Sequence, residues 1–181
     1  MNNNGNRPSP NGRHTFVVLV EDKPGVLNRV ASLFRRRGFN IESLTVGHSE
    51  EPEVSRMTIV MQADDVTAQR VTANLYKLVN VVRVDDVTED PSVMRDLALI
   101  KVRADSTSRA EVLQLCDVFR ARAVDVTPEA LIVEITGTED KIEGLLDVLR
   151  PFGILEMART GRIAMVRGSH PERVEMIPMR Q

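Results

Sequence analysis

The pattern of predicted secondary structure occurs twice between residues 14 and 167. In each copy, β-branched runs and amphipathic helical patterns follow one another in the order strand, helix, strand, strand, helix, strand. Each copy has about 75 residues and fits a split βαβ, ferredoxin-like domain with both helices on one face of an antiparallel sheet. The sequence therefore predicts an α+β protein made of two tandem ferredoxin-like βαββαβ domains.

The first copy is predicted to contain strands at residues 15–21, 39–48, 54–62 and 80–87 and helices at residues 26–37 and 65–78. Gly38 follows the first helix, where a left-handed residue commonly ends one. Apolar residues at positions i, i+3, i+4 and i+7 define the helix face that we expect to lie against the core: Leu27, Val30, Ala31 and Phe34.

The second copy is predicted to contain strands at residues 97–104, 123–126, 130–136 and 154–158, the last extended or followed by 163–166, and helices at residues 106–122 and 138–150. Pro151 stops the second helix. The core face of the first helix is expected to contain Val112, Leu115, Cys116 and Phe119.

The segments outside the two copies differ from them in composition. Residues 1–13 are rich in Asn, Gly, Pro and Ser, so they cannot bury enough apolar surface to offset their ordering entropy. We predict a disordered tail at 1–13, domains at 14–90 and 95–167, and a second tail at 168–181. No signal peptide and no apolar run near the ~20 residues needed to span a bilayer is evident, so a cytoplasmic protein is expected.

The sequence contains no catalytic or metal-binding motif. The chain has one cysteine and three histidines, and no histidine has a second ligand at metal spacing. His14 and His170 fall in margins that we expect to be unstructured. Cys116 lies on an apolar helix face without a neighbouring histidine, which favours a buried structural thiol. We therefore expect no catalytic residue, metal site or cofactor in this chain.

The charged residues indicate no nucleic-acid site. The formal net charge is -2, and the predicted central strand at 53–62 has no aromatic residue on which an RNA base could stack. Helix capping explains Asp64-Asp65, and a solvated strand end explains Asp85-Asp86. The basic run Arg35-Arg36-Arg37 suits a helix C-terminus, with contact to an acidic partner as the alternative.

The segment Asp22-Lys23-Pro24-Gly25-Val26 indicates a binding site. Pro24 suits the start of a helix, and Gly25 exposes bare backbone. The first helical amides have no internal partners and lie at the positive end of the dipole, so they can receive a carboxylate. Asp22 can accept from an ammonium group or cap the helix. These features favour an α-amino acid ligand, and an N-cap with a tight turn is the alternative explanation.

Longer strings point to a known family. The run Asp22-x-Pro24-Gly25-Val26-Leu27, with Gly38-Phe39-Asn40-Ile41 after the helix, resembles the ACT domain, a small-molecule sensing module. The strings at 37–46, 55–59, 119–128 and 158–161 resemble the small, regulatory subunit of acetolactate synthase (acetohydroxyacid synthase). The resemblance covers residues 14–167.

The resemblance implies a non-catalytic subunit of a transferase. The family's large subunit holds thiamine diphosphate, Mg2+ and FAD, and it condenses two pyruvates to acetolactate with loss of CO2 in branched-chain amino-acid biosynthesis. The small subunit raises that activity and confers feedback inhibition, usually by valine. The partners implied are the large catalytic subunit, valine and a second copy of this chain, with neither nucleic acid nor membrane.

The resemblance also implies a valine site between two ACT domains of a homodimer. Carried over to this sequence, one side contains Asp22, Lys23, Pro24, Gly25 and Val26, and the partner's side contains Asn40 and Ile41. The amides of Gly25 and Val26 would take the carboxylate, Asn40 and Asp22 would bracket the polar head, and Ile41 would receive the isopropyl group. A free-standing ACT amino-acid sensor and a catalytic ferredoxin-like enzyme are the competing hypotheses.

Overall fold

The computed structural model describes residues 12–168, and these form two compact units. One unit contains the described residues up to Val93 together with those from Ala164 onward, and the other contains Met94–Ile163. The division differs from the predicted limits of 14–90 and 95–167. Residues after Ala164 group with the first unit, where the Arg56 guanidinium donates to the Ala164 carbonyl at 2.8 Å. Residues 1–11 and 169–181, which hold nearly all of both predicted tails, lie outside the described part.

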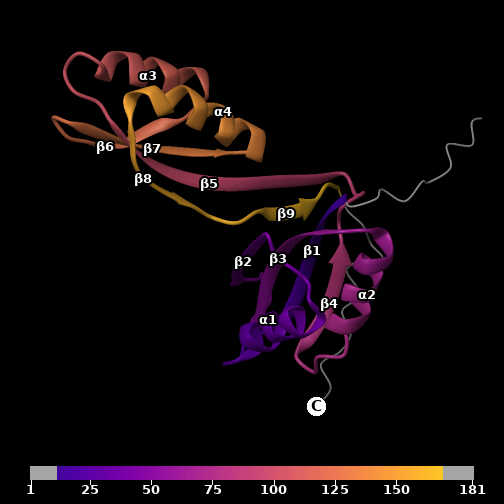
Figure 1. Ribbon diagram of the computed structural model, residues 1–181. Helices are drawn as coiled ribbons and strands as arrows, with labels where there is room; N and C mark the ends of the chain where they lie inside the picture. Colours follow the sequence, from indigo (N-terminus) through magenta and orange to yellow (C-terminus); the bar gives the residue numbers. More distant parts are fainter. Residues whose placement is uncertain (1–11, 169–181) are drawn as a thin grey trace, which may run out of the picture. The chain divides into compact units, whose positions relative to one another are not determined.

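The first unit has the predicted element order (Figure 1). Its sheet has the strand order β2-β3-β1-β4, and every pairing is antiparallel. The prediction of a disordered tail reaching residue 13 was wrong at its end, because Gly12 pairs with Ala63 and Arg13 with Gln62. The elements are β1 (Gly12–Glu21), α1 (Val26–Arg37), β2 (Ser43–His48), β3 (Val54–Ala63), α2 (Asp65–Leu75) and β4 (Val81–Asp86).

Both helices of the first unit cover the same face of its sheet, and the core lies between (Figure 1). The predicted inner face of α1 was partly wrong, because Leu27 is 44% exposed and Ala31 is only partly buried. The helix is rotated toward Val26 and Leu33, both of which are buried. Its buried residues are Val26, Val30, Leu33 and Phe34.

The predicted strand at 39–48 begins only at Ser43. Gly38 has a φ of 70° and, as predicted, ends α1 in the left-handed conformation. The Gly38 amide donates to the Arg35 carbonyl at 3.2 Å and the Phe39 amide to the Phe34 carbonyl at 3.0 Å, which is a Schellman motif. Gly38 and Phe39 are therefore held by the end of the helix, and a short connection follows before the strand begins.

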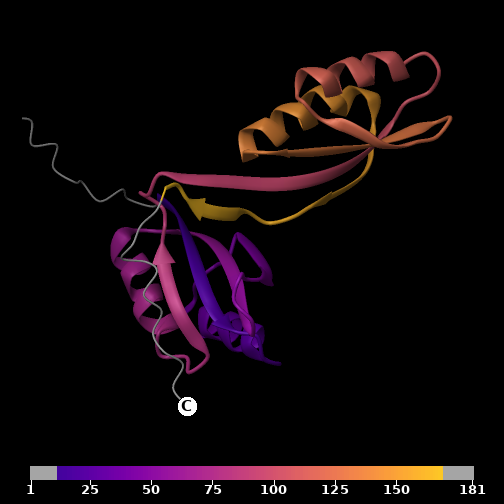
Figure 2. The ribbon, with the colours of Figure 1, turned by 180° about the vertical axis from the view of Figure 1, so that it is seen from behind.

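The second unit repeats the arrangement, as the view from behind shows (Figure 2). Its strand order is β6-β7-β5-β8, and β9 pairs with β5 off this path. Cys116 and Val112 are buried on the inner face of α3, as predicted. The elements are β5 (Ser92–Arg103), α3 (Arg109–Val118), β6 (Arg122–Val126), β7 (Ala130–Gly137), α4 (Glu139–Leu149), η1 (Arg150–Phe152) and β8 (Ile154–Arg159). The last strand, β9 (Ile163–Val166), groups with the first unit from Ala164 onward.

The helix predicted at 106–122 is shorter than expected because both of its ends are occupied by turns. The Asp105 carboxylate accepts from the amides of Thr107 and Ser108 at 2.9 and 3.0 Å, so these residues form a turn before α3. Arg120 has a φ of 51°, which is incompatible with continuing a right-handed helix. The helix predicted at 65–78 likewise ends at Leu75.

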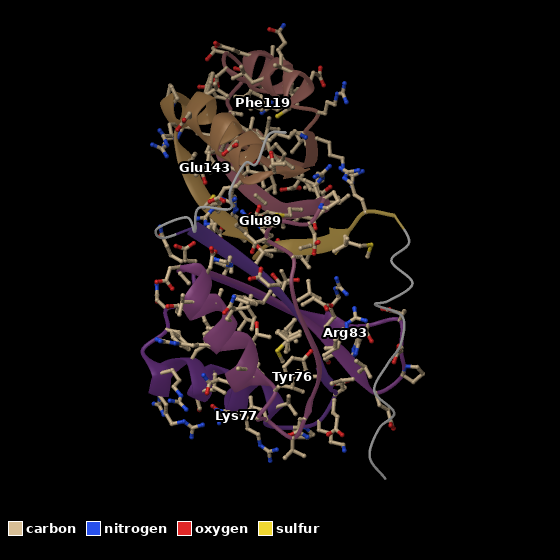
Figure 3. All side chains as sticks on the ribbon, turned by 90° about the vertical axis from the view of Figure 1, so that its right-hand side faces the viewer. Tyr76, Lys77, Arg83, Glu89, Phe119 and Glu143 are labelled. Atoms are coloured by element: carbon tan, nitrogen blue, oxygen red, sulfur yellow. The ribbon has the colours of Figure 1, made fainter. Side chains whose placement is uncertain are left out.

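An ion-pair cluster ties three elements of the second unit together. The Arg159 guanidinium of β8 donates to the Asp96 carboxylate of β5 at 2.7 and 3.0 Å and to Glu143 of α4 at 2.7 Å. Glu143 is labelled in Figure 3, where α4 lies against the sheet. Both hydrogen bonds to Asp96 end on its Oδ2, and Asp96 is only 8% exposed, so this charge-assisted pair is well shielded from solvent.

The two edges of the first sheet differ. Tyr76, labelled in Figure 3, follows α2, and its hydroxyl donates to the Val84 carbonyl at 3.2 Å and accepts from the Val84 amide at 3.1 Å. These bonds occupy the outer side of the edge strand β4 in its second half. The opposite edge strand, β2, has β3 on one side and no strand of the described chain on the other.

Candidate functional site

The predicted binding segment is a type II β-turn placed directly before α1. Pro24 occupies its second position, and Gly25 occupies its third with φ 84° and ψ -4°. The Val26 amide closes the turn by donating to the Lys23 carbonyl at 3.3 Å. The expectation that Pro24 lies in the first helical turn was wrong, because α1 begins at Val26 and Gly25 is its N-cap.

The turn leaves several amides available at the start of α1. The helix has no side-chain cap, and its first internal hydrogen bond runs from the Arg29 amide to the Gly25 carbonyl at 3.0 Å. Within the described chain, the amides of Gly25, Leu27 and Asn28 have no hydrogen-bond partner. A carboxylate at this end would meet unpaired donors and the positive end of the helix dipole. The Val26 amide, which was expected to receive the carboxylate together with that of Gly25, is instead used to close the turn, and the next available donors are the amides of Leu27 and Asn28.

The side chains around the turn have different surroundings. The exposed Asp22 carboxylate lies 3.4 Å from Nδ1 of His48, an exposed histidine at the end of β2. The Lys23 ammonium is directed to Glu21, 3.1 Å away. The Val26 side chain is 4% exposed and lies in the core, so it cannot contact a ligand at the surface.

The second predicted side, Asn40 and Ile41, occupies the short connection between α1 and β2. Asn40 is exposed, and Ile41 packs partly against the core. On the other side of this pair, the Glu42 amide donates to the Val60 carbonyl at 2.8 Å. The Glu42 carboxylate also accepts from Nε of Arg13 at 2.8 Å. Asn40 and Ile41 are therefore held between the Schellman motif and this anchored residue.

The structure does not bring the two predicted sides together within one chain. The turn follows the end of β1, beside His48 at the end of β2, because both strand ends pair with the same part of β3. Asn40 and Ile41 instead precede the start of β2. This strand has six residues, so its two ends lie about 17 Å apart at about 3.4 Å per residue. A single amino acid cannot contact both sides of one chain.

The remaining candidate residues have structural surroundings. The expectation for His14 was wrong, because it lies buried in β1, 2.8 Å from the Asp86 carboxylate and stacked on Phe16. Asp64 caps α2 as expected, and its hydrogen bonds to Thr67 lower the pKa of its carboxyl. The Asp85 carboxylate is not simply solvated, since it pairs with Arg83 at 2.8 Å.

The structure offers no sign of a metal centre or a reactive thiol in the described residues. Cys116 is buried on α3, and burial raises the pKa of its thiol. No group of three or more potential metal-ligating side chains comes together within residues 12–168. His170 lies outside the described residues. None of the helices described is long and apolar enough to cross a membrane.

A βαββαβ unit whose first helix begins at a bare, glycine-containing turn has the architecture of an ACT-type module, and a second unit of similar topology follows it. Residues 16–83 match the family model for the AHAS small subunit-like ACT domain. Residues 95–168 match the family model for the small subunit of acetolactate synthase. The chain belongs to the acetolactate synthase small subunit family.

Individual relatives agree with this assignment. A probable acetolactate synthase small subunit of Archaeoglobus fulgidus is 54% identical over 157 residues, which cover 87% of this chain and 98% of the relative. The acetolactate synthase small subunit of Mycolicibacterium smegmatis is 54% identical, with 86% and 91% covered. The crystal structure of the small subunit from Thermotoga maritima superposes with a TM-score of 0.82 at 44% identity and covers 88% of this chain and 99% of that one.

Proposed function

We propose that this chain activates the catalytic subunit of acetolactate synthase and makes it sensitive to inhibition by valine. The support is the family, together with a turn that presents unpaired amides beside a carboxylate. In this proposal the partner holds thiamine diphosphate, Mg2+ and FAD and condenses two pyruvates to acetolactate and CO2. This chain contributes no reacting group, and both subunits act in the cytoplasm.

The effector site would form when two copies pair through β2. In an antiparallel pair related by a two-fold axis, the end of one β2 lies beside the start of the other. The turn of one copy, next to His48, would then face Asn40 and Ile41 of the second copy. The observation that carries this proposal is that the two halves lie at opposite ends of an unpaired edge strand. Each dimer would contain two identical sites.

The chemistry of the two halves suits a small α-amino acid. The amides of Gly25, Leu27 and Asn28 would receive the ligand carboxylate, and Asp22 would accept from its ammonium group. Asn40 of the second copy would complete the polar side, and the half-buried Ile41 would receive a branched apolar side chain. One methylene of misfit is worth only about 1–3 kcal/mol, so valine would be preferred over leucine by a modest factor.

The test reconstitutes the full chain with the acetolactate synthase catalytic subunit of the same source. Acetolactate formation is measured with and without this chain and during titration with valine, leucine and isoleucine. We expect higher activity with the chain and inhibition at the lowest concentration by valine. No change in activity would overturn the proposal, and amino-acid binding without such an effect would favour a free-standing ACT sensor.

A further inference from the structure

Asn80 is a buried polar residue that neither the sequence motifs nor the family argument singled out. It precedes β4 and is 8% exposed. Its backbone carbonyl accepts from the Glu21 amide at 2.9 Å. Its side-chain NH2 donates to the Glu21 carboxylate, and its side-chain carbonyl accepts from the guanidinium of Arg29. Asn80 therefore makes three hydrogen bonds to two residues that are remote from it in sequence.

The two partners determine how the Asn80 amide is oriented. A guanidinium can only donate and an ionised carboxylate can only accept, so the side-chain oxygen must face Arg29 and the nitrogen must face Glu21. The hydrogen bond from Asn80, followed by that from Lys23, lowers the pKa of the Glu21 carboxyl. The carboxylate is therefore ionised at neutral pH, and an acidic side chain at position 80 would face a like charge.

Asn80 bridges the two ends of the candidate effector turn. Glu21 is the last residue of β1 and directly precedes Asp22. Arg29 lies in the first helical turn of α1, and its amide donates to the Gly25 carbonyl. The helix α1 has no side-chain cap of its own, and the Asn80 side chain contacts one residue on each side of the turn.

We propose that Asn80 is a positioning residue of the effector site. It fixes the distance between the end of β1 and the start of α1, and so it sets the direction of the turn amides and of Asp22. This inference rests on the function proposed above. It adds that effector affinity depends on a side chain that does not contact the effector.

The test compares Asn80→Ala, Asn80→Asp and the double variant Glu21→Gln/Asn80→Asp in the reconstituted holoenzyme. Asn80→Asp places two carboxylates in contact, and we expect the half-inhibitory valine concentration to rise about tenfold or more. In the double variant the new amide at position 21 can donate to the new carboxylate at position 80 while Arg29 still donates from the other side, so sensitivity should return. Asn80→Ala should lie between wild type and Asn80→Asp. Asn74→Ala, which removes only a bond within α2, is the matched control and should behave as wild type.

The outcomes separate this inference from the proposed function. A wild-type holoenzyme that no branched-chain amino acid inhibits would refute the proposed function itself. A wild type that is inhibited, with an unchanged half-inhibitory concentration in Asn80→Asp, would overturn the role of Asn80 alone. If Asn80→Asp loses sensitivity and the double variant folds without regaining it, the reciprocal arrangement of donors is wrong and the inference fails. A double variant that regains sensitivity shows that charge complementarity, rather than a loss of folding, controls the site.

Discussion

Replacing Gly25 with Asp tests whether the turn before α1 receives the effector's carboxylate. A Cβ atom added at Gly25 would meet no atom within 4 Å beyond its chain neighbours, so there is space for a side chain to begin there. The φ of 84° imposes backbone strain, which costs an L-residue about 1–2 kcal/mol and Asn or Asp less. Negative charge near a helix N-terminus returns about 0.3–1 kcal/mol. We therefore expect the variant to fold and to retain most of its activation of the catalytic subunit.

The effect on the effector should be much larger than the effect on folding. Two like charges about 4 Å apart near a protein surface repel by about 4 kcal/mol. This energy corresponds to a loss of affinity on the order of a thousandfold. Valine should therefore no longer inhibit acetolactate formation by Gly25→Asp at the concentrations that inhibit the wild type.

Gly25→Asn is the matched control, because it has the same shape and tolerates the same φ without the charge. We expect its half-inhibitory valine concentration to rise far less than that of Gly25→Asp. Equal rises in both variants would show that the backbone or the volume matters rather than the charge. Unchanged inhibition in both would refute the placement of the effector at this turn.

Three further predictions concern assembly and stability. Light scattering should show dimers of the chain at micromolar concentration. Val46→Lys on β2 should weaken these dimers, because like charges on paired edge strands repel. A wild-type chain that stays monomeric, with or without valine, would contradict the β2 interface. Arg159→Ala should lower the free energy of unfolding, measured in urea, by about 3 kcal/mol, because it leaves the buried Asp96 carboxylate unpaired. Arg122→Ala, which removes an exposed ion pair, should cost less than about 1 kcal/mol. Equal losses would show that burial does not strengthen the Arg159–Asp96 pair. The hydrogen bonds from Thr107 and Ser108 lower the pKa of the Asp105 carboxyl in the folded state, so the stability that this carboxylate contributes is present above about pH 4 and is lost as the pH falls toward the folded pKa. In Asp105→Asn the urea midpoint of unfolding should therefore fall less steeply as the pH is lowered. An unchanged dependence on pH would contradict this.

The order of elements could be predicted because it depends on local patterns. β-branched runs, helical spacing and the glycine at position 38 each act over a few residues, and both units follow the predicted order. The inner face of α1 could not be chosen in the same way. The sequence offers Leu27-Val30-Ala31-Phe34 and Val26-Val30-Leu33 as overlapping sets at helical spacing, and only packing on the sheet decides between them.

The residues that the sequence missed are those defined by long-range pairing. His14 looked marginal because the residues before it are polar, but β3 is long enough to pair with it and bury it. His48 reaches Asp22, and Asn80 reaches Glu21, only because the strands place remote segments side by side. The turn itself was visible in the sequence, because Pro24 and Gly25 have a local conformational meaning. Its separation from Asn40 and Ile41 depends on strand register, which no local pattern encodes.

The hydroxyl of Tyr76 limits how far assembly through the first sheet can proceed. It engages the backbone of Val84 on the outer side of β4, so the sheet has one blocked edge and one open edge. If two copies join through β2 as proposed, both outer edges of the combined sheet would be β4 strands with this tyrosine in place. Growth through this sheet would then end at two copies instead of continuing into a filament. A phenylalanine at position 76 would remove that limit while leaving the core intact.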